Sequence, residues 1–367
     1  MNAVTELNAA VDLPETVAIT PAVAAATPTV RLMQAADLAR WDEFVLNCPQ
    51  ATFFHRAGWQ QVIERAFGHR TYFLLAEAEG KICGILPLAE IKSRLFGHSL
   101  SALPFCVYGG VATEHPTAAA ALEARADQLA RELGVAHLEY RNLHARHADW
   151  PSKALYVTFR KTIEADDEAN MQAIPRKQRA MVRKGIKFEL KSEIDQDTTR
   201  FFAAYSASVH RLGTPVFSRK YFRLLLEVFG KDAEVMTITK DGVTVASVLS
   251  FYFRDEVLPY YGGGADNARE FAGNDFMYWE LMRRACARGI RVFDFGRSKL
   301  GTGSYDFKKN WGFVAEPLHY EYRLYGAQSV PDTNPLNPKY QLMIKTWKRM
   351  PLALANLIGP HIVKHLG

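Results

Sequence analysis

Cysteines and long apolar runs are both scarce in the 367-residue sequence. The four cysteines, Cys48, Cys83, Cys106 and Cys286, lie far apart, form no Cys-x-x-Cys pair and have no histidine at metal-ligand spacing. This pattern argues against a disulfide framework and a zinc site, so we expect buried thiols and no bound metal. No run reaches the roughly 18 apolar residues that a membrane span requires, and a cytoplasmic location is expected.

Basic residues are missing from the N-terminal segment. No lysine or arginine precedes Arg31, although Glu6, Asp12 and Glu15 are present. A secretory signal has a basic start and a transit peptide is rich in arginine, so neither is predicted. The abundance of Ala, Thr, Val and Pro in residues 1–30 predicts a disordered leader.

The remaining composition is that of a folded protein with a mild basic excess. The apolar fraction is 48% and the net charge is +6. The length suits two domains, since one domain takes roughly 150 residues. The positive charge favours anionic partners such as phosphorylated substrates, RNA or a membrane surface, and is equally typical of a solvated basic face.

The chain contains one pattern twice. The turn Glu79-Gly80 recurs as Asp241-Gly242, and Tyr108-Gly109-Gly110 recurs as Tyr261-Gly262-Gly263, in the same order. Each copy predicts two helices, a hairpin closed by an acidic-Gly turn, a third strand, an amphipathic helix and a last strand. The predicted helices are 37–47, 59–67 and 117–133 in the first copy and 197–212, 218–229 and 274–288 in the second; the last strands are 137–141 and 292–295.

This element order resembles that of the GNAT acyltransferase unit. We therefore expect an α/β fold (α+β, with mixed sheets) made of two tandem GNAT-like domains. The expected domains are 31–160 and 161–325, the second of which carries the active site and ends in a strand at 320–325. A basic tail, 326–367, follows.

Residues 176–191 carry seven Lys or Arg against one acid. Pro175 suits a first helical turn, and Arg176, Arg179 and Arg183 share one face at helical spacing. Three guanidinium groups on one face suit phosphate oxygens. A solvated charged helix between domains would show the same pattern.

Cationic residues also follow the last strand of the second copy. Arg297, Lys299, Lys308 and Lys309 come after Gly296, interleaved with glycines and aromatic residues. Sites in α/β sheets gather beyond strand ends, and a cation there could stabilise the oxyanion of an acyl transfer. The other interpretation is a flexible Gly-Thr-Gly-Ser loop with solvated lysines. The Gly-Lys-Ser/Thr ending of a P-loop is missing.

Two motifs resemble the FemAB family: Phe-Lys-Lys-Asn-Trp-Gly-Phe at 307–313 and the basic stretch 176–184. Residues 212–216 and 294–298 further resemble FemAB-related proteins of PEP-CTERM and exopolysaccharide systems, and the second copy resembles a BioF2-like acyltransferase domain. FemAB enzymes transfer amino acids from aminoacyl-tRNA to a peptidoglycan precursor. The resemblance, which spans about residues 30–325, implies a similar transfer here.

The resemblance also implies roles for individual residues. Lys308 matches the signature lysine and would steady the oxyanion or the donor ester. Asp294 would accept a proton or orient the amine, or would be a buried carboxylate that caps the next loop. The remaining assignments are phosphate binding by Arg176, Arg179 and Arg183, and a cleft lined by Arg297, Tyr305 and Tyr261. Tyr261 is equally typical of an aromatic core strand.

The sequence departs from the related families at two places. Residues 201–232 leave no room for the helical arm that many FemAB enzymes carry. Residues 269–274 match the coenzyme A loop of GNAT enzymes poorly, although they precede a helix. We expect no tightly bound cofactor and an acyl donor that is either aminoacyl-tRNA or acyl-CoA. The expected partners are a phosphorylated or anionic envelope precursor and tRNA.

The tail contains no acid from Thr333 to Gly367 but several basic and apolar residues. A basic amphipathic segment can bind an anionic membrane at the inner face. Packing on the first domain would explain its apolar residues equally well. Pro351 and Pro360 are expected to divide it into short pieces.

Three hypotheses for function follow. The first is an N-acyltransferase or aminoacyltransferase acting on an amine of a cell-envelope, peptidoglycan-related or exopolysaccharide intermediate. The second is an acyl-CoA-dependent GNAT enzyme acting on a small amine. The third is a non-catalytic RNA-binding or membrane-binding protein that retains the double fold.

Overall fold

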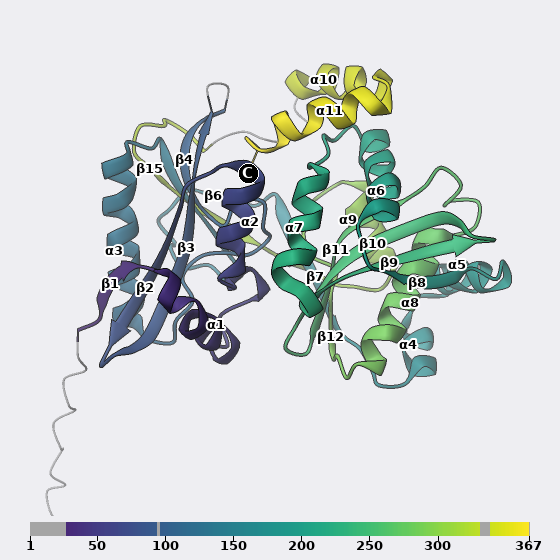
Figure 1. The fold of residues 1–367 in the computed structure, drawn as a ribbon, viewed down its shortest axis with the longest axis horizontal. Helices are drawn as coiled ribbons and strands as arrows, with labels where there is room; N and C mark the ends of the chain where they lie inside the picture. The colour runs from purple at the N-terminus through teal and green to yellow at the C-terminus, as the bar shows by residue number, and fades with distance from the viewer. Residues whose placement is uncertain (1–26, 94–95, 331–337, 367) are drawn as a thin grey trace, which may run out of the picture.

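The computed structural model describes residues 27–93, 96–330 and 338–366. The leader expected at 1–30 therefore lies mostly outside the described residues. Its predicted end is too late, because the first strand, β1, already spans Thr29–Leu32 and pairs with residues 74–77. Figure 1 shows two α/β units side by side, with two further helices along the upper edge.

The first unit is built on a mixed sheet with the strand order β1-β2-β3-β4-β5-β15-β6. Three longer helices accompany it: α1 (Leu38–Asn47), α2 (Gly58–Phe67) and α3 (Pro116–Leu133). The other strands are β2 (Thr71–Ala78), β3 (Lys81–Ser93), β4 (Gly97–Ala102), β5 (His137–Asn142), β6 (Ser152–Lys153) and β15 (His319–Leu324).

The second unit has the strand order β13-β7-β12-β11-β10-β9-β8, with β14 paired to β7. Its strands are β7 (Tyr156–Thr162), β8 (Lys191–Asp195), β9 (Ala233–Lys240), β10 (Val243–Phe253), β11 (Glu256–Gly264), β12 (Val292–Asp294), β13 (Ser298–Lys299) and β14 (Ala315–Pro317). Its helices are α4 (Asp167–Ala173), α5 (Arg176–Lys187), α6 (Thr199–Leu212), α7 (Arg219–Phe229), α8 (Gly273–Ala287) and α9 (Gly303–Asn310).

The predicted element order is present in both copies. Each copy has two helices, a hairpin, a third strand, a helix and a last strand, and the fold class is confirmed. Both hairpins turn on an acidic residue and a glycine with positive φ, Glu79-Gly80 and Asp241-Gly242. Such turns match the twist of the flanking strands, which is why the same dipeptide type closes both hairpins.

The copies differ at the Tyr-Gly-Gly segments. Tyr261, Gly262 and Gly263 lie within β11, whereas Tyr108 and the glycines after it lie in a loop beyond β4. This loop returns to the sheet at Ala112, which bridges to Ile85. A strand therefore contains the Tyr-Gly-Gly segment in the second copy, whereas in the first copy the segment follows the strand.

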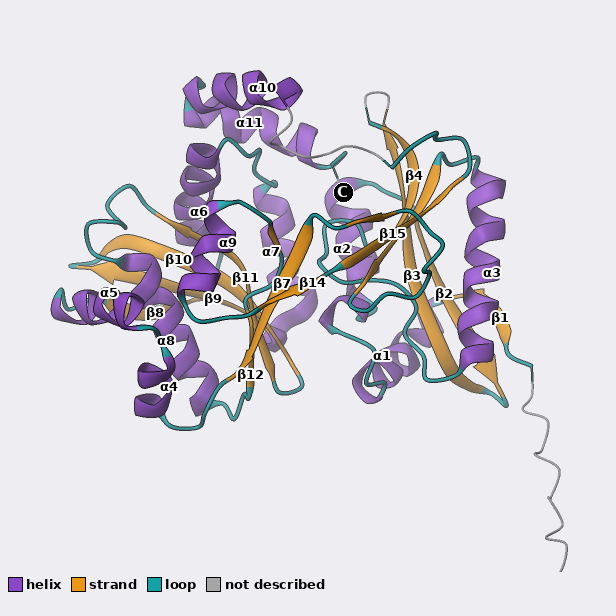
Figure 2. Cartoon of the chain, turned by 180° about the vertical axis from the view of Figure 1, so that it is seen from behind, coloured by secondary structure: helices purple, strands orange, loops and turns teal. Residues whose placement is uncertain are grey.

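The closing strand does not stay with the second copy as expected. β15 inserts between β5 and β6 of the first sheet, whereas β7 belongs to the second sheet. The chain thus crosses between the sheets twice, in the middle of the molecule (Figure 2). The alternation in 319–324 indicates a strand but not its partner, and the free edge of β5 is what can bury Tyr320 and Tyr322.

Aromatic side chains from both units form one shared core. The ring of Phe53 lies 4.3 Å from Phe251 and 4.7 Å from Phe229. Nearby, the guanidinium of Arg254, at the β10–β11 turn, donates to the carbonyls of Val45 and Cys48 at the end of α1. Packed rings and a helix cap therefore fix the two units against one another over this part of their boundary.

The tail forms two helices, α10 (Pro338–Arg349) and α11 (Leu352–Val363). They pack chiefly on α6 of the second unit, which corrects the alternative that placed them on the first. Pro351 separates the helices as expected, but Pro360 lies inside α11 without ending it. No helix in the described part of the chain is long and apolar enough to cross a membrane.

Candidate active site

Lys308 lies on α9, directly beyond the end of β12. Its Nζ donates to the carbonyl oxygens of Gly296 at 2.9 Å and Arg297 at 3.0 Å. Burial disfavours the charged ammonium and lowers the pKa of Lys308 from 10.5 to about 7; Asp294 opposes this effect and Arg297 adds to it. An ammonium has three N–H bonds, so one remains for a ligand.

Helix α9 is held in place by the residues that follow it. Trp311 is fully buried, and its indole N–H donates to Asp275 of α8 at 3.0 Å. Gly312 has a φ of +81° and passes closely against Pro175. The sequence motif therefore provides the anchor as well as the lysine: Phe307 and Trp311 pack inward, and Lys308 is left at the strand end.

Asp294 lies beside Lys308 but has its oxygens occupied. It accepts hydrogen bonds from the Gly296 N–H at 2.7 Å, Tyr108 Oη at 2.9 Å and Thr158 Oγ1 at 3.4 Å, and Arg160 lies at 3.6 Å. The residue is 1% exposed, and burial raises the pKa of its carboxyl. This geometry favours the interpretation of a buried carboxylate that caps the next loop, and joins it to Tyr108 of the first unit.

Arg297 is a half-buried cation, and most of its N–H donors have no partner among the described residues. Its Nη1 donates to Tyr320 Oη at 3.0 Å, and its guanidinium lies 4.6 Å from the ring centroid of Tyr156. Among the described residues no carboxylate pairs with it. Because an arginine carries five N–H donors, most remain available for a ligand anion.

Tyr305 and Tyr261 have separate locations. Tyr305 packs edge-on against Phe159 at 5.5 Å, the same ring over which Lys308 lies at 5.7 Å. Tyr261 instead bonds to Tyr221 within the shared aromatic core and does not reach Lys308. The cleft assignment of Tyr261 is therefore wrong: it lies on the face of β11 that α6 and α7 cover, where Tyr205 and Phe222 pack against it.

The predicted basic helix is confirmed as α5. It packs on α8 through Gln178, Val182 and Gly185, while Arg176 and Arg183 point to solvent without an ion pair in the described chain. Arg179 differs, because its guanidinium donates to the carbonyls of Ile174 and Gln172 and closes the end of α4. Two of the three predicted arginines therefore remain available for phosphate.

Tyr278 is a residue that the sequence reasoning missed. The parallel strands β11 and β12 pair only at Glu256–Val292 and Val257–Phe293 and have no further paired residues beyond them. Beyond this pairing, Tyr278 of α8 contacts both chain segments: its ring lies 4.7 Å from the ring of Phe295, which follows β12, and its hydroxyl lies close to Gly262 of β11. The glycine run in β11 was the available signal, since a glycine inside a strand marks a close approach.

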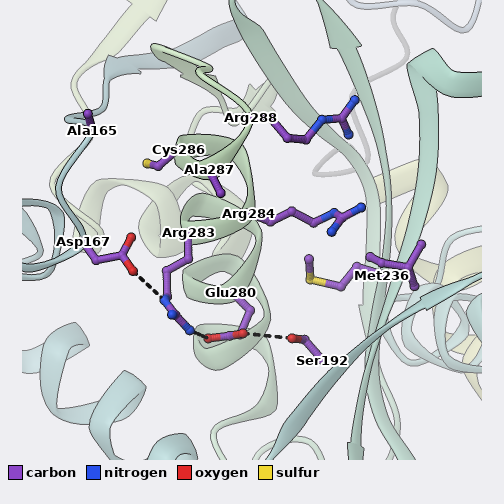
Figure 3. A pocket seen from close by; sticks show the side chains of 11 residues that line it. Ala165, Asp167, Ser192, Met236, Glu280, Arg283, Arg284, Cys286, Ala287 and Arg288 are labelled. Atoms are coloured by element: carbon purple, nitrogen blue, oxygen red, sulfur yellow. Dashed lines mark hydrogen bonds and ion pairs between the residues drawn. The ribbon is translucent and has the colours of Figure 1, made fainter.

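A pocket beside α8 lies apart from Lys308. A pocket of about 490 Å³ is lined by arginines of α8 together with residues of β8 and α4. Figure 3 shows Arg283 joined to Asp167 and Glu280, and Arg284 is paired with Glu234. Because its arginines are already neutralised and Lys308 is not among its lining residues, we do not assign the transfer chemistry to this pocket.

A family model matches most of the second unit. Residues 169–309 match the family model of the acetyltransferase (GNAT) domain, a span that includes Asp294, Arg297 and Lys308. The second unit thus resembles a GNAT domain, and the match identifies the protein as an acyltransferase. A search among curated proteins finds no match.

Solved structures resemble the whole chain in fold. FemX matches with a TM-score of 0.65 and 15% identity, over 86% of this chain and 100% of that one. The C-terminal domain of a lysylphosphatidylglycerol synthetase from Agrobacterium fabrum matches at 0.53 and 13%, over 81% and 99%. A tandem GNAT protein of clavulanic acid biosynthesis matches at 0.52 and 12%, over 83% and 100%. These likenesses confirm the tandem GNAT-like fold.

Proposed function

We propose that the protein transfers an aminoacyl or acyl group to an amine of an anionic cell-envelope intermediate. The observation that carries this proposal is the half-buried Lys308, held by two carbonyls at the end of β12 with a pKa near 7. The span that matches the acetyltransferase model contains this lysine. The FemX and lysylphosphatidylglycerol synthetase likenesses support an envelope acceptor.

In the proposed reaction the acceptor nitrogen attacks the acyl carbonyl carbon of the donor ester. The carbonyl oxygen becomes an oxyanion, which the ammonium of Lys308 stabilises in a site with little water. Collapse of this intermediate breaks the ester bond and forms the amide. The proton lost by the amine leaves with the donor oxygen as a hydroxyl, so no additional acid or base is consumed.

The loop before α8 leaves few main-chain N–H groups for the pyrophosphate of coenzyme A. A pyrophosphate at a helix N-terminus needs free main-chain N–H groups. Here the N–H groups of six residues donate to main-chain carbonyls within the protein: Ala265, Ala268, Glu270, Phe271, Ala272 and Gly273. The buried Asp275 carboxyl also occupies the first turn of α8. We therefore favour aminoacyl-tRNA, with the exposed cations of α5 on its phosphates.

The acceptor would be recognised through its negative charge. Arg297 supplies unpaired N–H donors beside Lys308. The parallel N–H groups of a guanidinium can bind two oxygens of one phosphate or carboxylate. Tyr156 of the second sheet and Tyr320 of the first sheet hold the guanidinium in place. A phosphorylated precursor bound there would bring its amine toward the lysine.

A rate comparison of two neighbouring lysines tests the proposal. Lys308→Met should reduce amide formation from aminoacyl-tRNA by roughly 100-fold or more, because a donor to the oxyanion is lost. Lys309→Met is the matched control, since Lys309 is exposed, and should retain the wild-type rate. The products are measured by mass spectrometry of envelope precursors. An unchanged rate for Lys308→Met would contradict the assignment.

An acyl-CoA donor acting on a small amine remains the second candidate. The GNAT family match favours it. Coenzyme A should then raise the melting temperature, because a ligand that binds the native state stabilises it. The absence of a shift, together with transfer from aminoacyl-tRNA, would exclude this candidate.

A further inference from the structure

The tail helices present a group of large apolar side chains to solvent. Six of the fifteen exposed large hydrophobic residues in the described chain lie between Leu342 and Leu366. Leu342 is 73% exposed and Leu357 is 67% exposed. Single exposed leucines are common on protein surfaces, but a concentration of this kind marks a binding surface.

Helical geometry divides each tail helix into two faces. In α10 the buried face carries Trp347, and the opposite face carries Leu342, Thr346 and Arg349. In α11 the buried face carries Ala355, Gly359 and Val363, and the opposite face carries Leu354, Leu357 and His361. The outer face of α11 is therefore mainly apolar, and that of α10 combines Leu342 with polar and cationic side chains; Figure 1 shows both helices along one edge of the molecule.

The inner faces fix this pair of helices in place. Gly213 and Gly359 allow close contact, the first with Ile344 and the second with the main chain of Val216. His210 bonds to the carbonyl of Trp347 at 3.1 Å, and His69 of the first unit bonds to the carbonyl of Lys364 at 2.6 Å. The outer face is consequently preformed and does not depend on folding upon binding.

The charge of this surface is of one sign. No acidic residue occurs from Thr333 to Gly367, whereas five lysines or arginines do. Lys345, Lys348 and Arg349 are exposed on α10 and have no ion pair in the described part of the chain. Apolar groups flanked by unneutralised cations are complementary to acyl chains beneath anionic headgroups.

We propose that α10 and α11 dock the protein on an anionic phospholipid bilayer. Each helix has twelve residues and is only about 18 Å long, so it lies in the interface and does not span it. A second copy of the chain fits this surface poorly. In a two-fold interface the same cations would face one another without any acid to pair with.

Vesicle flotation of the full-length protein tests the docking. Wild type should float with phosphatidylcholine vesicles that contain phosphatidylglycerol. Binding should weaken when salt is added, and it should also be weaker to vesicles made of phosphatidylcholine alone. Leu342→Asp combined with Leu357→Asp should reduce binding about tenfold or more, since two apolar insertions are lost. Failure of the wild type to float, or equal binding by this variant, would overturn the proposal.

A matched variant separates docking from general changes in charge. Val243→Asp combined with Val314→Asp adds the same charge at side chains that are 60% and 73% exposed outside the tail, and should bind as wild type does. Sedimentation velocity measures whether the same surface instead mediates self-association. If wild type dimerises and the Leu342→Asp, Leu357→Asp variant does not, the surface mediates self-association and the bilayer proposal fails.

Discussion

Lys308 is costly for the fold to hold as an ammonium. Its surroundings are two aromatic rings, two carbonyls and the cation of Arg297, and the counter-charge of Asp294 only partly compensates. Residues whose pKa values are displaced by burial and a specific neighbour are concentrated at functional sites. The arrangement is therefore better explained by chemistry than by stability.

This cost predicts a pH dependence of stability. The unfolded chain keeps Lys308 protonated up to about 10.5, whereas the folded chain releases the proton near 7. Because the unfolded state then binds more protons, stability from this group rises with pH between 7 and 10.5. Lys308→Met should melt higher than wild type at pH 6 to 7, by an amount that shrinks toward pH 10. A difference in melting temperature that is constant with pH would contradict the displaced pKa.

At the scale of elements, α5 depends on one glycine for its position. A Cβ at Gly185 would lie 2.7 Å from the Cβ of Phe276 on α8, a closer approach than packed side chains allow. This contact, with the Gln178–Asp275 hydrogen bond of 3.0 Å, holds the basic helix beside the end of α9. The cations of α5 are thereby fixed close to the unit that carries Lys308.

Two alanine substitutions test this contact. Alanine favours a helix over glycine by about 1 kcal/mol, yet Gly185→Ala should destabilise the protein by about 1–3 kcal/mol because α5 and α8 must separate. Gly303→Ala in α9 meets open space and should be neutral or slightly stabilising. Chemical denaturation measures both. Equal stability of the two variants would show that α5 adjusts without cost.

At the scale of the whole molecule, the two units are interlaced. The chain leaves the first sheet after β6, builds the second sheet and returns as β15, whose six residues pair with β5. Glu321 of β15 also accepts a hydrogen bond from His147 of the first unit at 2.8 Å. The first unit therefore depends on residues that are more than 150 positions away in the sequence.

Truncation distinguishes this interlacing from two independent domains. A chain that ends after Leu318 lacks β15 and should lose hydrogen-exchange protection in β5, because those amides lose their partners. A chain that ends after Val330 keeps β15, lacks the same tail helices and should retain the protection. Hydrogen–deuterium exchange of residues 137–142 provides the measurement. Equal protection in both chains would show that β15 is dispensable.

Local patterns of the sequence determined which segments form helices and strands and which segment carries the candidate catalytic residues. The acidic-Gly turns, the helical periodicity and the cations after Gly296 are properties of neighbouring residues, so the double fold and the Lys308 segment followed from them. Contacts between distant residues do not leave such a local pattern. Only the tertiary structure placed β15 in the first sheet, turned Tyr261 into the aromatic core and bonded Tyr108 to Asp294, because burial and hydrogen-bond partners are decided by packing.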